Sequence, residues 1–219
     1  MARGKFLRLF IGNMASAKTR HLITEVDTLR RYGNKKIAVF KPQTDVRSGM
    51  NLLKSRKGDE GLAEEISVTN PAEIWGILRA RESEMGCRFQ VIAFDEVQFF
   101  PRDCGFFQVV NQLLNDGYDV LASGLALDFR GEPFGSTGDL AMIAEDRCMW
   151  LTAYCTKCGA RAPYPQRIIN GEPAHYNSPQ VFVGGDETYE PRCDDHFVLP
   201  GRPFSGPEEL GLQRKIWST

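Results

Sequence analysis

An apolar run that leads directly into a lysine-containing loop constrains this chain most. Phe6–Ile11 is followed by the residues Gly12-Asn13-Met14-Ala15-Ser16-Ala17-Lys18-Thr19. This order matches G-x-x-x-x-G-K-[ST], a loop between a strand and a helix that binds nucleotide phosphates, with alanine in place of the second glycine. Backbone N–H groups and the helix dipole would face the phosphates, Lys18 would add a positive charge, and the Thr19 hydroxyl would face Mg²⁺. On its own, the motif also fits an ordinary strand–loop–helix with a surface lysine.

Ala17 decides how well such a loop can work. If this position needs a positive φ, the Cβ costs about 1–2 kcal/mol. If it lies in the first helical turn with a negative φ, the cost is small, because alanine is a good helix former. We expect the second case, since Lys18 and Thr19 begin the helix. A reduced nucleotide affinity stays open.

A pair of acids follows a second apolar run. Asp95 and Glu96 come directly after Phe89–Phe94, at the expected carboxyl end of a strand. Ligands bind at this end of the strands in parallel sheets, and Gly12 falls at such an end as well. Asp95 can hold Mg²⁺ through water, and Glu96 can accept a proton from a substrate hydroxyl as a general base. The alternative is two solvated acids at a turn.

The spacing of apolar residues predicts an α/β fold with a P-loop-like parallel sheet and helices on both faces. We expect strands at 5–11, 36–40, 66–68, 89–94 and 119–123. We expect helices at 18–32, 71–85 and 104–115, the second capped by Asn70 before Pro71, and a polar loop over 43–65.

Composition and charge exclude several classes of protein. The chain has 219 residues, of which 42% are hydrophobic and 25% charged, with a net charge of −1. This balance gives no electrostatic footprint for nucleic acid or a membrane surface, and no apolar run is long enough to span a bilayer. The basic N-terminus leads into a short strand-like run rather than a signal peptide. We therefore predict a cytoplasmic protein without a nucleic-acid or membrane partner.

A cysteine cluster marks the C-terminal third. Cys155 and Cys158 form one pair, and Cys193 and His196 form another, each with two residues between its members. Four such ligands suit a tetrahedral, closed structural Zn²⁺ site, and a reducing compartment favours metal ligation over disulfides. Asp194 or Asp195 could compete with His196 as the fourth ligand, and unrelated buried thiols are the plainer alternative.

These strings resemble the thymidine kinase family, the type with a zinc-bearing lasso domain. The match covers about residues 5–197 and is closest to bacterial or phage members. Besides the phosphate loop and the cysteine pairs it rests on Asp45-x-Arg47, Asp95-Glu96-x-Gln98-Phe99-Phe100, Gly124-Leu125 and Asp128-Phe129-Arg130-Gly131-Glu132-Pro133-Phe134-Gly135. Two positions depart from the family pattern: Ala17, and Ala126, where many members have an acid.

The resemblance implies a kinase that transfers the γ-phosphate of ATP to the 5′-hydroxyl of thymidine, giving dTMP and ADP. Glu96 would be the catalytic base. ATP and Mg²⁺ would be bound by Gly12, Asn13, Met14, Ala15, Ser16, Ala17, Lys18, Thr19, Arg47, Asp95 and Gln98. The nucleoside would be bound by Met14, Phe99, Leu125, Phe129, Phe134, Val183, Gly184 and Tyr189. A structural Zn²⁺ would be held by Cys155, Cys158, Cys193 and His196.

The resemblance also implies a three-part organisation and a homo-oligomer, a tetramer in much of the family. Residues 1–150 would form the nucleotide-binding α/β domain, 151–197 the zinc-binding lasso domain and 198–219 a C-terminal tail. The lasso before Cys193 would close over the base through backbone hydrogen bonds. From the residues alone, Gly184-Gly185 is more simply a turn. Phe129 and Phe134 lie in a polar, glycine-bearing stretch, which favours stacking on a flat ring, although most phenylalanines are core residues.

Two rival interpretations remain at this stage. One is a nucleotide-binding regulatory protein of the same fold, catalytically impaired by Ala17. The other is a zinc-ribbon binding module with an incidental ATPase domain, against which the near-neutral charge and the intact Phe129–Phe134 stretch argue.

Overall fold

The computed structural model describes residues 5–44, 52–54, 60–144, 147–180 and 187–203. Three predicted ligand-binding residues, Arg47, Val183 and Gly184, lie outside the described residues, as does the tail from 204 onward.

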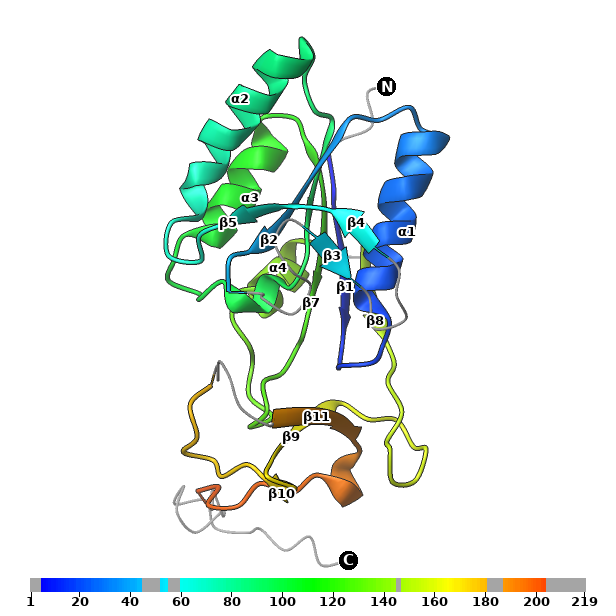
Figure 1. The fold of residues 1–219 in the computed structure, drawn as a ribbon, viewed down its shortest axis with the longest axis vertical. Coiled ribbons are helices and arrows are strands. Elements are labelled where there is room, and N and C mark those ends of the chain that lie inside the picture. Colours follow the sequence, from blue (N-terminus) through cyan, green and yellow to red (C-terminus); the bar gives the residue numbers. More distant parts are fainter. Residues whose placement is uncertain (1–4, 45–51, 55–59, 145–146, 181–186, 204–219) are drawn as a thin grey trace, which may run out of the picture.

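A parallel sheet of six strands forms the centre of the larger part of the molecule (Figure 1). Its order is β5-β2-β6-β7-β1-β8, and all neighbours run parallel. The strands are β1 (Leu7–Gly12), β2 (Ile37–Pro42), β5 (Glu64–Ile66), β6 (Val91–Phe94), β7 (Asp119–Gly124) and β8 (Cys148–Leu151). The prediction of a parallel α/β sheet is confirmed.

Helices cover both faces of this sheet, as predicted (Figure 1). They are α1 (Lys18–Arg31), α2 (Ile74–Met85), α3 (Phe106–Asn115) and α4 (Thr137–Ala144). Leu22 and Val26 of α1 pack on one face, in a core cluster with Phe10 and Leu121. The other three helices pack on the opposite face, where Phe94 of β6 meets the ring of Phe106 edge-on at 5.1 Å. Strands buried on both faces explain the near-continuous apolar runs of the sequence.

Expectations between β2 and α2 need correction. The strand expected at 66–68 is β5, two residues earlier, because Phe40 pairs with Glu64 and Pro42 with Ile66. The Ser67 N–H leaves the ladder and donates to the carboxylate of Glu73 instead. The polar loop expected at 43–65 contains an antiparallel pair, β3 (Leu52–Lys54) and β4 (Glu60–Leu62).

Two helix starts also differ from expectation. Pro71–Glu73 form a short 3₁₀-helix, η1, before α2, and Asn70 makes no side-chain capping bond. The helix expected from 104 begins at Phe106, because Gly105 has a φ of 86° and breaks the helical path before it.

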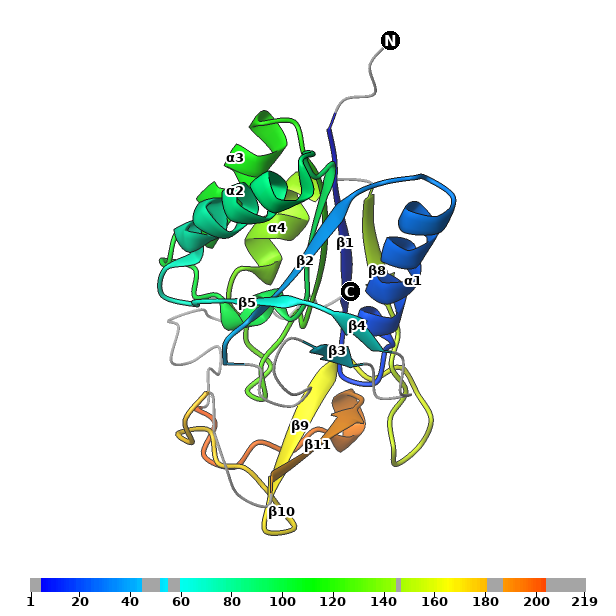
Figure 2. The same ribbon diagram turned by 45° about the horizontal axis from the view of Figure 1, so that its top comes forward.

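A smaller module follows the main sheet in the chain. Its sheet contains β9 (Tyr164–Ile169), β10 (Glu172–Pro173) and β11 (Glu187–Arg192), all antiparallel, and is followed by a 3₁₀-helix, η4 (Asp194–His196). Figures 1 and 2 both place this module beyond the end of β1 that carries Gly12. The domain boundary expected between residues 150 and 151 stays a prediction; β8 extends across it, and Leu151 still pairs with Gly12. Among the helices described, none is both long enough and apolar enough to cross a bilayer.

Candidate active site

The phosphate loop lies between β1 and α1, at the carboxyl edge of the main sheet. Gly12 ends β1 in a tight space, since a Cβ there would lie 2.5 Å from both the Leu151 carbonyl oxygen and the Ser16 Oγ. Only glycine therefore fits this position. Within the described part of the chain, the buried Ser16 hydroxyl has no hydrogen-bond partner, which suits a loop whose polar groups bind an anion.

The expectation for Ala17 is wrong. Ala17 is the N-cap of α1 with φ 67° and ψ 25°, in the left-handed region, and Ala15 has a φ of 62°. The loop curls back on itself, with the Ser16 N–H 3.3 Å from the Asn13 carbonyl oxygen. Each alanine in this conformation costs about 1–2 kcal/mol, which glycine would avoid.

Lys18 and Thr19 are the first two residues of α1, directly after the loop. The buried Lys18 ammonium donates to the Asn13 carbonyl oxygen at 2.9 Å, which holds it against the inside of the loop. The Thr19 hydroxyl lies 3.3 Å from Asp95 Oδ1, and the Ser123 hydroxyl donates to the same oxygen. Asp95 is only 3% exposed. A hydroxyl and a carboxylate at one place are oxygen ligands that suit Mg²⁺.

Glu96 occupies a strained turn directly after Asp95. Its φ of 52° is left-handed, and it caps the 3₁₀-helix η2 (Val97–Phe99). Such outliers occur at functional sites when the surrounding structure holds them. The side chain of Gln98 donates to the Glu96 carboxylate, and its own oxygen accepts the Leu125 N–H at 3.0 Å. The predicted base is therefore connected to the residue that follows β7.

Leu125, the residue to which Gln98 connects Glu96, belongs to an apolar cluster. It is made by five of the predicted nucleoside-binding residues, drawn from distant parts of the chain: Met14, Phe99, Leu125, Phe134 and Tyr189. The rings of Phe99 and Phe134 meet edge-to-face at 5.8 Å. Met14 belongs to the phosphate loop and Tyr189 to β11, so the cluster spans both parts of the molecule.

Phe129 lies outside this cluster. Its ring is buried, with the guanidinium carbon of Arg167 at 4.1 Å from the ring centroid and that of Arg130 at 5.0 Å. A contact between Phe129 and a nucleoside stays a prediction.

Arg167 is a residue that the sequence reading missed. Its side chain is buried to 1% exposure in β9. The guanidinium donates to the Tyr189 hydroxyl and to the carbonyl oxygens of Pro179 and Gln180, each at 2.6 Å. The sequence gives no signal that a single arginine in this strand would bond to Tyr189 and to two backbone carbonyl groups.

The four predicted zinc ligands come together. Their ligand atoms all lie within 4.8 Å of one another. The Sγ atoms of Cys158 and Cys193 are 3.6 Å apart, and Cys155 Sγ is 3.8 Å from His196 Nδ1. A tetrahedron with Zn–S bonds of about 2.3 Å has edges of about 3.8 Å, so the cluster fits the metal. Among the residues described, the group of close ligand atoms contains His196 and neither Asp194 nor Asp195. Asp194 accepts a hydrogen bond from the Tyr164 hydroxyl at 3.1 Å.

The surroundings of Cys155 favour its thiolate. Burial raises the pKa of this thiol, but backbone N–H groups, including that of Lys157 at 3.4 Å, outweigh burial and lower the pKa to about 6. The thiolate is the form that binds a metal.

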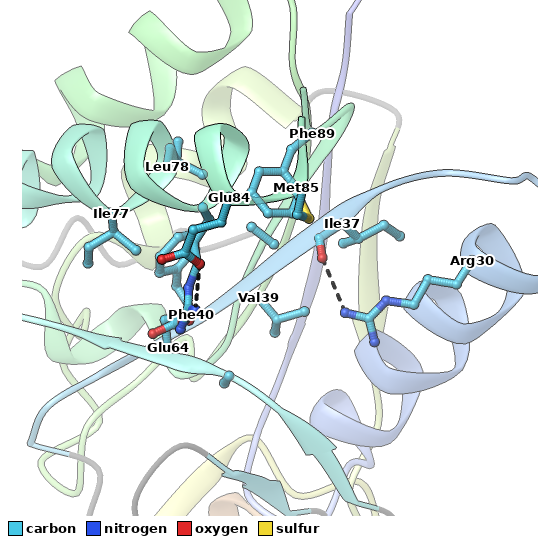
Figure 3. Close-up of a pocket in the computed structure, with 13 residues that line it drawn as sticks. Arg30, Ile37, Val39, Phe40, Glu64, Ile77, Leu78, Glu84, Met85 and Phe89 are labelled. Atoms are coloured by element: carbon cyan, nitrogen blue, oxygen red, sulfur yellow. Dashed lines mark hydrogen bonds and ion pairs between the residues drawn. The ribbon is translucent and has the colours of Figure 1, made fainter. Parts of the chain in front are cut away.

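A cavity of about 390 Å³ lies elsewhere, between α1, β2 and α2 (Figure 3). Apolar side chains such as Val39, Leu78 and Phe89 line it, and Arg81 is ion-paired with Glu64 and Glu84 at its edge. Of the residues described, no predicted site residue lines this cavity, so it is separate from the candidate active site.

The parallel sheet, the lysine loop at the end of β1 and the acids at the end of β6 form the arrangement expected of a nucleotide-binding α/β protein, here followed in the chain by a Cys/His cluster that fits zinc. A family model described as thymidine kinase matches residues 5–197. The chain belongs to the thymidine kinase family and is an enzyme of this family.

Named relatives agree with this family. The chain is 42% identical over 194 residues to a thymidine kinase of Pyrobaculum aerophilum, covering 89% of this chain and 99% of the relative. It is 40% identical over 200 residues to one of Thermococcus kodakarensis, covering 91% and 98%. It is 35% identical over 200 residues to one of Mycoplasmoides gallisepticum, covering 91% and 84%. The alternative of a catalytically impaired regulatory protein finds no support in these matches.

Proposed function

We propose that the protein transfers the γ-phosphate of ATP to the 5′-hydroxyl of thymidine, giving dTMP and ADP. The observation that supports this proposal is the set of contacts made by Asp95 and Glu96 at the end of β6. On one side, Asp95 contacts Thr19 of the phosphate loop at 3.3 Å. On the other, Gln98 connects Glu96 to Leu125 of the apolar cluster. A base in this position serves a hydroxyl held between a phosphate and a flat apolar ring.

The phosphate side works by positioning and charge. Lys18 and the loop N–H groups bind the phosphate oxygens, while Thr19 and Asp95 hold Mg²⁺. The metal, when bound with ATP, neutralises charge that develops on the phosphates. Arg47 is proposed to approach the transferring phosphate by family resemblance alone.

The nucleoside side presents the hydroxyl to Glu96. In this proposal the cluster of Met14, Phe99, Leu125, Phe134 and Tyr189 encloses the pyrimidine ring of the nucleoside and excludes water. Glu96 accepts the proton of the 5′-hydroxyl of thymidine while the 5′-oxygen attacks the γ-phosphorus of ATP in line and ADP leaves. Gln98 holds the Glu96 carboxylate in a fixed direction during this step. The family resemblance further implies that Val183 and Gly184 contact the pyrimidine ring through their backbones.

The zinc-binding module has a structural role in this proposal. Four protein ligands fill a tetrahedral site, so no position is left for a substrate or an activated water. The metal would fix Cys193, which directly follows the strand that carries Tyr189. We assign residues 1–150, 151–197 and 198–219 to the three parts expected from the sequence.

Assembly and location complete the proposal. We retain a homo-oligomer, with the tetramer as the expected form, which light scattering of the purified protein tests. We retain a cytoplasmic location, because a site of three thiols and a histidine suits a reducing compartment.

One experiment tests the central proposal. The purified protein is incubated with Mg²⁺, ATP labelled at the γ-phosphate and each of the four deoxynucleosides, with deoxyuridine as a fifth acceptor. Labelled dTMP is the expected product. A monophosphate of a different nucleoside would contradict the substrate, and release of phosphate without any monophosphate would contradict the transfer.

A further inference from the structure

The side chain of Asn13 joins the phosphate loop to the zinc-binding module. Its Nδ2 donates to the carbonyl oxygens of Ala162 and Tyr164, each at 2.8 Å. Its Oδ1 accepts the N–H of Met14 at 2.6 Å. The side chain is buried, with the residue only 6% exposed. Both functional atoms of the amide are therefore committed to protein groups, and two of the three bonds cross between the two parts of the molecule.

The two carbonyl groups belong to a segment that the metal ligands hold. Ala162 is buried in one cluster with Cys155 and Cys193. Two residues on, Tyr164 stacks on Phe197 at 4.5 Å and donates its hydroxyl to Asp194, both neighbours of the ligand pair Cys193 and His196. A change at the metal site would therefore move the groups that Asn13 binds.

Within the phosphate loop, the backbone of Asn13 contacts the residues around the strained positions Ala15 and Ala17. Its carbonyl oxygen accepts the Lys18 ammonium at 2.9 Å and the Ser16 N–H at 3.3 Å. Ala15 and Ala17, on either side of Ser16, both have left-handed backbones. Strain of this kind persists only where neighbouring structure holds the backbone in place. The side chain of Asn13 connects this strained loop to the zinc-binding module.

We propose that Asn13 is a positioning residue that makes the shape of the phosphate loop, and so its affinity for ATP, depend on the zinc-binding module. Its side chain acts through Met14 and the backbone of the loop, and does not itself contact phosphate. The inference concerns the ATP site of the proposed function and rests on it, but it is tested by nucleotide binding and not by turnover.

The first test compares two variants of the full zinc-loaded chain. Asn13→Asp keeps the shape and the acceptor for Met14, but it replaces the donor with a carboxylate that repels two carbonyl oxygens. Asn13→Ala removes all three bonds. We expect the Kd for ATP-Mg, measured by calorimetry, to rise about 10- to 100-fold in both variants, since two or three buried hydrogen bonds are lost. Asn177→Asp makes the same chemical change at an exposed site of the same module and should leave this Kd unchanged.

Two further measurements separate positioning from general damage. Adding Ala17→Gly to Asn13→Ala should recover most of the lost affinity, because glycine takes the left-handed conformation without strain and needs less support. Removing zinc with a chelator should weaken ATP binding in the parent, and by a much smaller factor in Asn13→Asp, where the link is already broken. Circular dichroism checks that each protein keeps its helices.

Parent-like ATP affinity in both Asn13 variants would overturn the inference, and so would an equal effect of zinc removal in the parent and in Asn13→Asp. If these results occur while the parent still makes dTMP, the inference about Asn13 is wrong and the proposed function is upheld. If the parent makes no dTMP but binds ATP in an Asn13-dependent way, the inference stands and the reaction is wrong. A parent that binds no ATP overturns both.

Discussion

Gln98 donates a hydrogen bond from its side-chain amide to the carboxylate of Glu96, two residues earlier in the chain. The same side chain accepts the N–H of Leu125 at 3.0 Å and is only 1% exposed. The direction of the proposed base is thus fixed by a buried amide whose other end is tied to the backbone after β7. This relationship gives the first two predictions.

Glu96→Gln should remove the base while keeping the size of the side chain. We expect turnover to fall by about 10²–10⁴-fold, the usual contribution of general base catalysis, with thymidine binding nearly intact. Steady-state kinetics and a thymidine titration measure the two quantities. Glu84→Gln changes an exposed acid at the far cavity and should behave as the parent. Parent-like turnover in Glu96→Gln would rule out this base.

Gln98→Met should free the Glu96 carboxylate without creating a large cavity. Hydrogen bonds to charged groups contribute about 1.5–3 kcal/mol, so we expect a fall in kcat of about 10- to 100-fold. The KM for ATP should change little, because the amide bonds Glu96 and Leu125. Gln112→Met, at an exposed site on α3, is the matched control. A variant in which only the KM for ATP rises would instead favour the contact to ATP or Mg²⁺ that the family resemblance implies.

Arg167→Lys should weaken thymidine binding. A lysine cannot replace the three hydrogen bonds to Tyr189, Pro179 and Gln180, so we expect the KM for thymidine to rise about 10- to 100-fold. The KM for ATP and the zinc content should stay near those of the parent. Arg192→Lys removes another buried guanidinium of the same module, one bonded to Thr156 and Glu190, and provides the comparison for lost stability. Equal thymidine constants in the two variants would show that Arg167 has no special role.

Zinc removal should weaken thymidine more than ATP. The module supplies Tyr189 to the nucleoside cluster directly, whereas it reaches the phosphate loop through Asn13. Calorimetric titrations of metal-free and zinc-restored protein with each ligand measure the ratio, and Cys158→Ser repeats the comparison without a chelator. An unchanged thymidine affinity in metal-free protein would count against a role of the module in the nucleoside pocket.

Ala17→Gly should improve an enzyme that already works. Relief of a left-handed alanine is worth about 1 kcal/mol, which predicts a rise in the melting temperature of a few degrees and a KM for ATP several-fold lower. Gly138→Ala, in open space on α4, is a control for the general effect of one methyl group. If the parent shows no kinase activity and Ala17→Gly does, the parent would be a protein whose catalysis is impaired by Ala17.

The sequence was sufficient where one local pattern carries one physical requirement. Each apolar run predicted a strand of the sheet, and the spacing within each ligand pair predicted the group of Cys155, Cys158, Cys193 and His196, because each run and each pair consists of residues close together in the chain. Gly12 was expected from its motif, and the closed space around it explains the requirement.

It was insufficient where tertiary contacts override local preference. Alanine favours helices, yet Ala17 is left-handed because the loop before α1 must curl toward Asn13. The bonds of Asn13 to Ala162 and Tyr164, and those of Arg167 to Tyr189, join positions that carry no mutual signal in a single sequence. The packing of the Arg167 and Arg130 guanidinium groups over the Phe129 ring is likewise a tertiary contact that no local sequence pattern predicts.

The wide spread of the apolar cluster along the chain has a consequence for biosynthesis. A nascent polypeptide that has left the ribosome as far as Leu151 contains every strand of the main sheet, but Tyr189 has not yet emerged. The carbonyl groups that anchor Asn13 also come late, at Ala162 and Tyr164. Competence for either substrate would therefore arise only after these later segments have been synthesised, when every strand of the main sheet is already present.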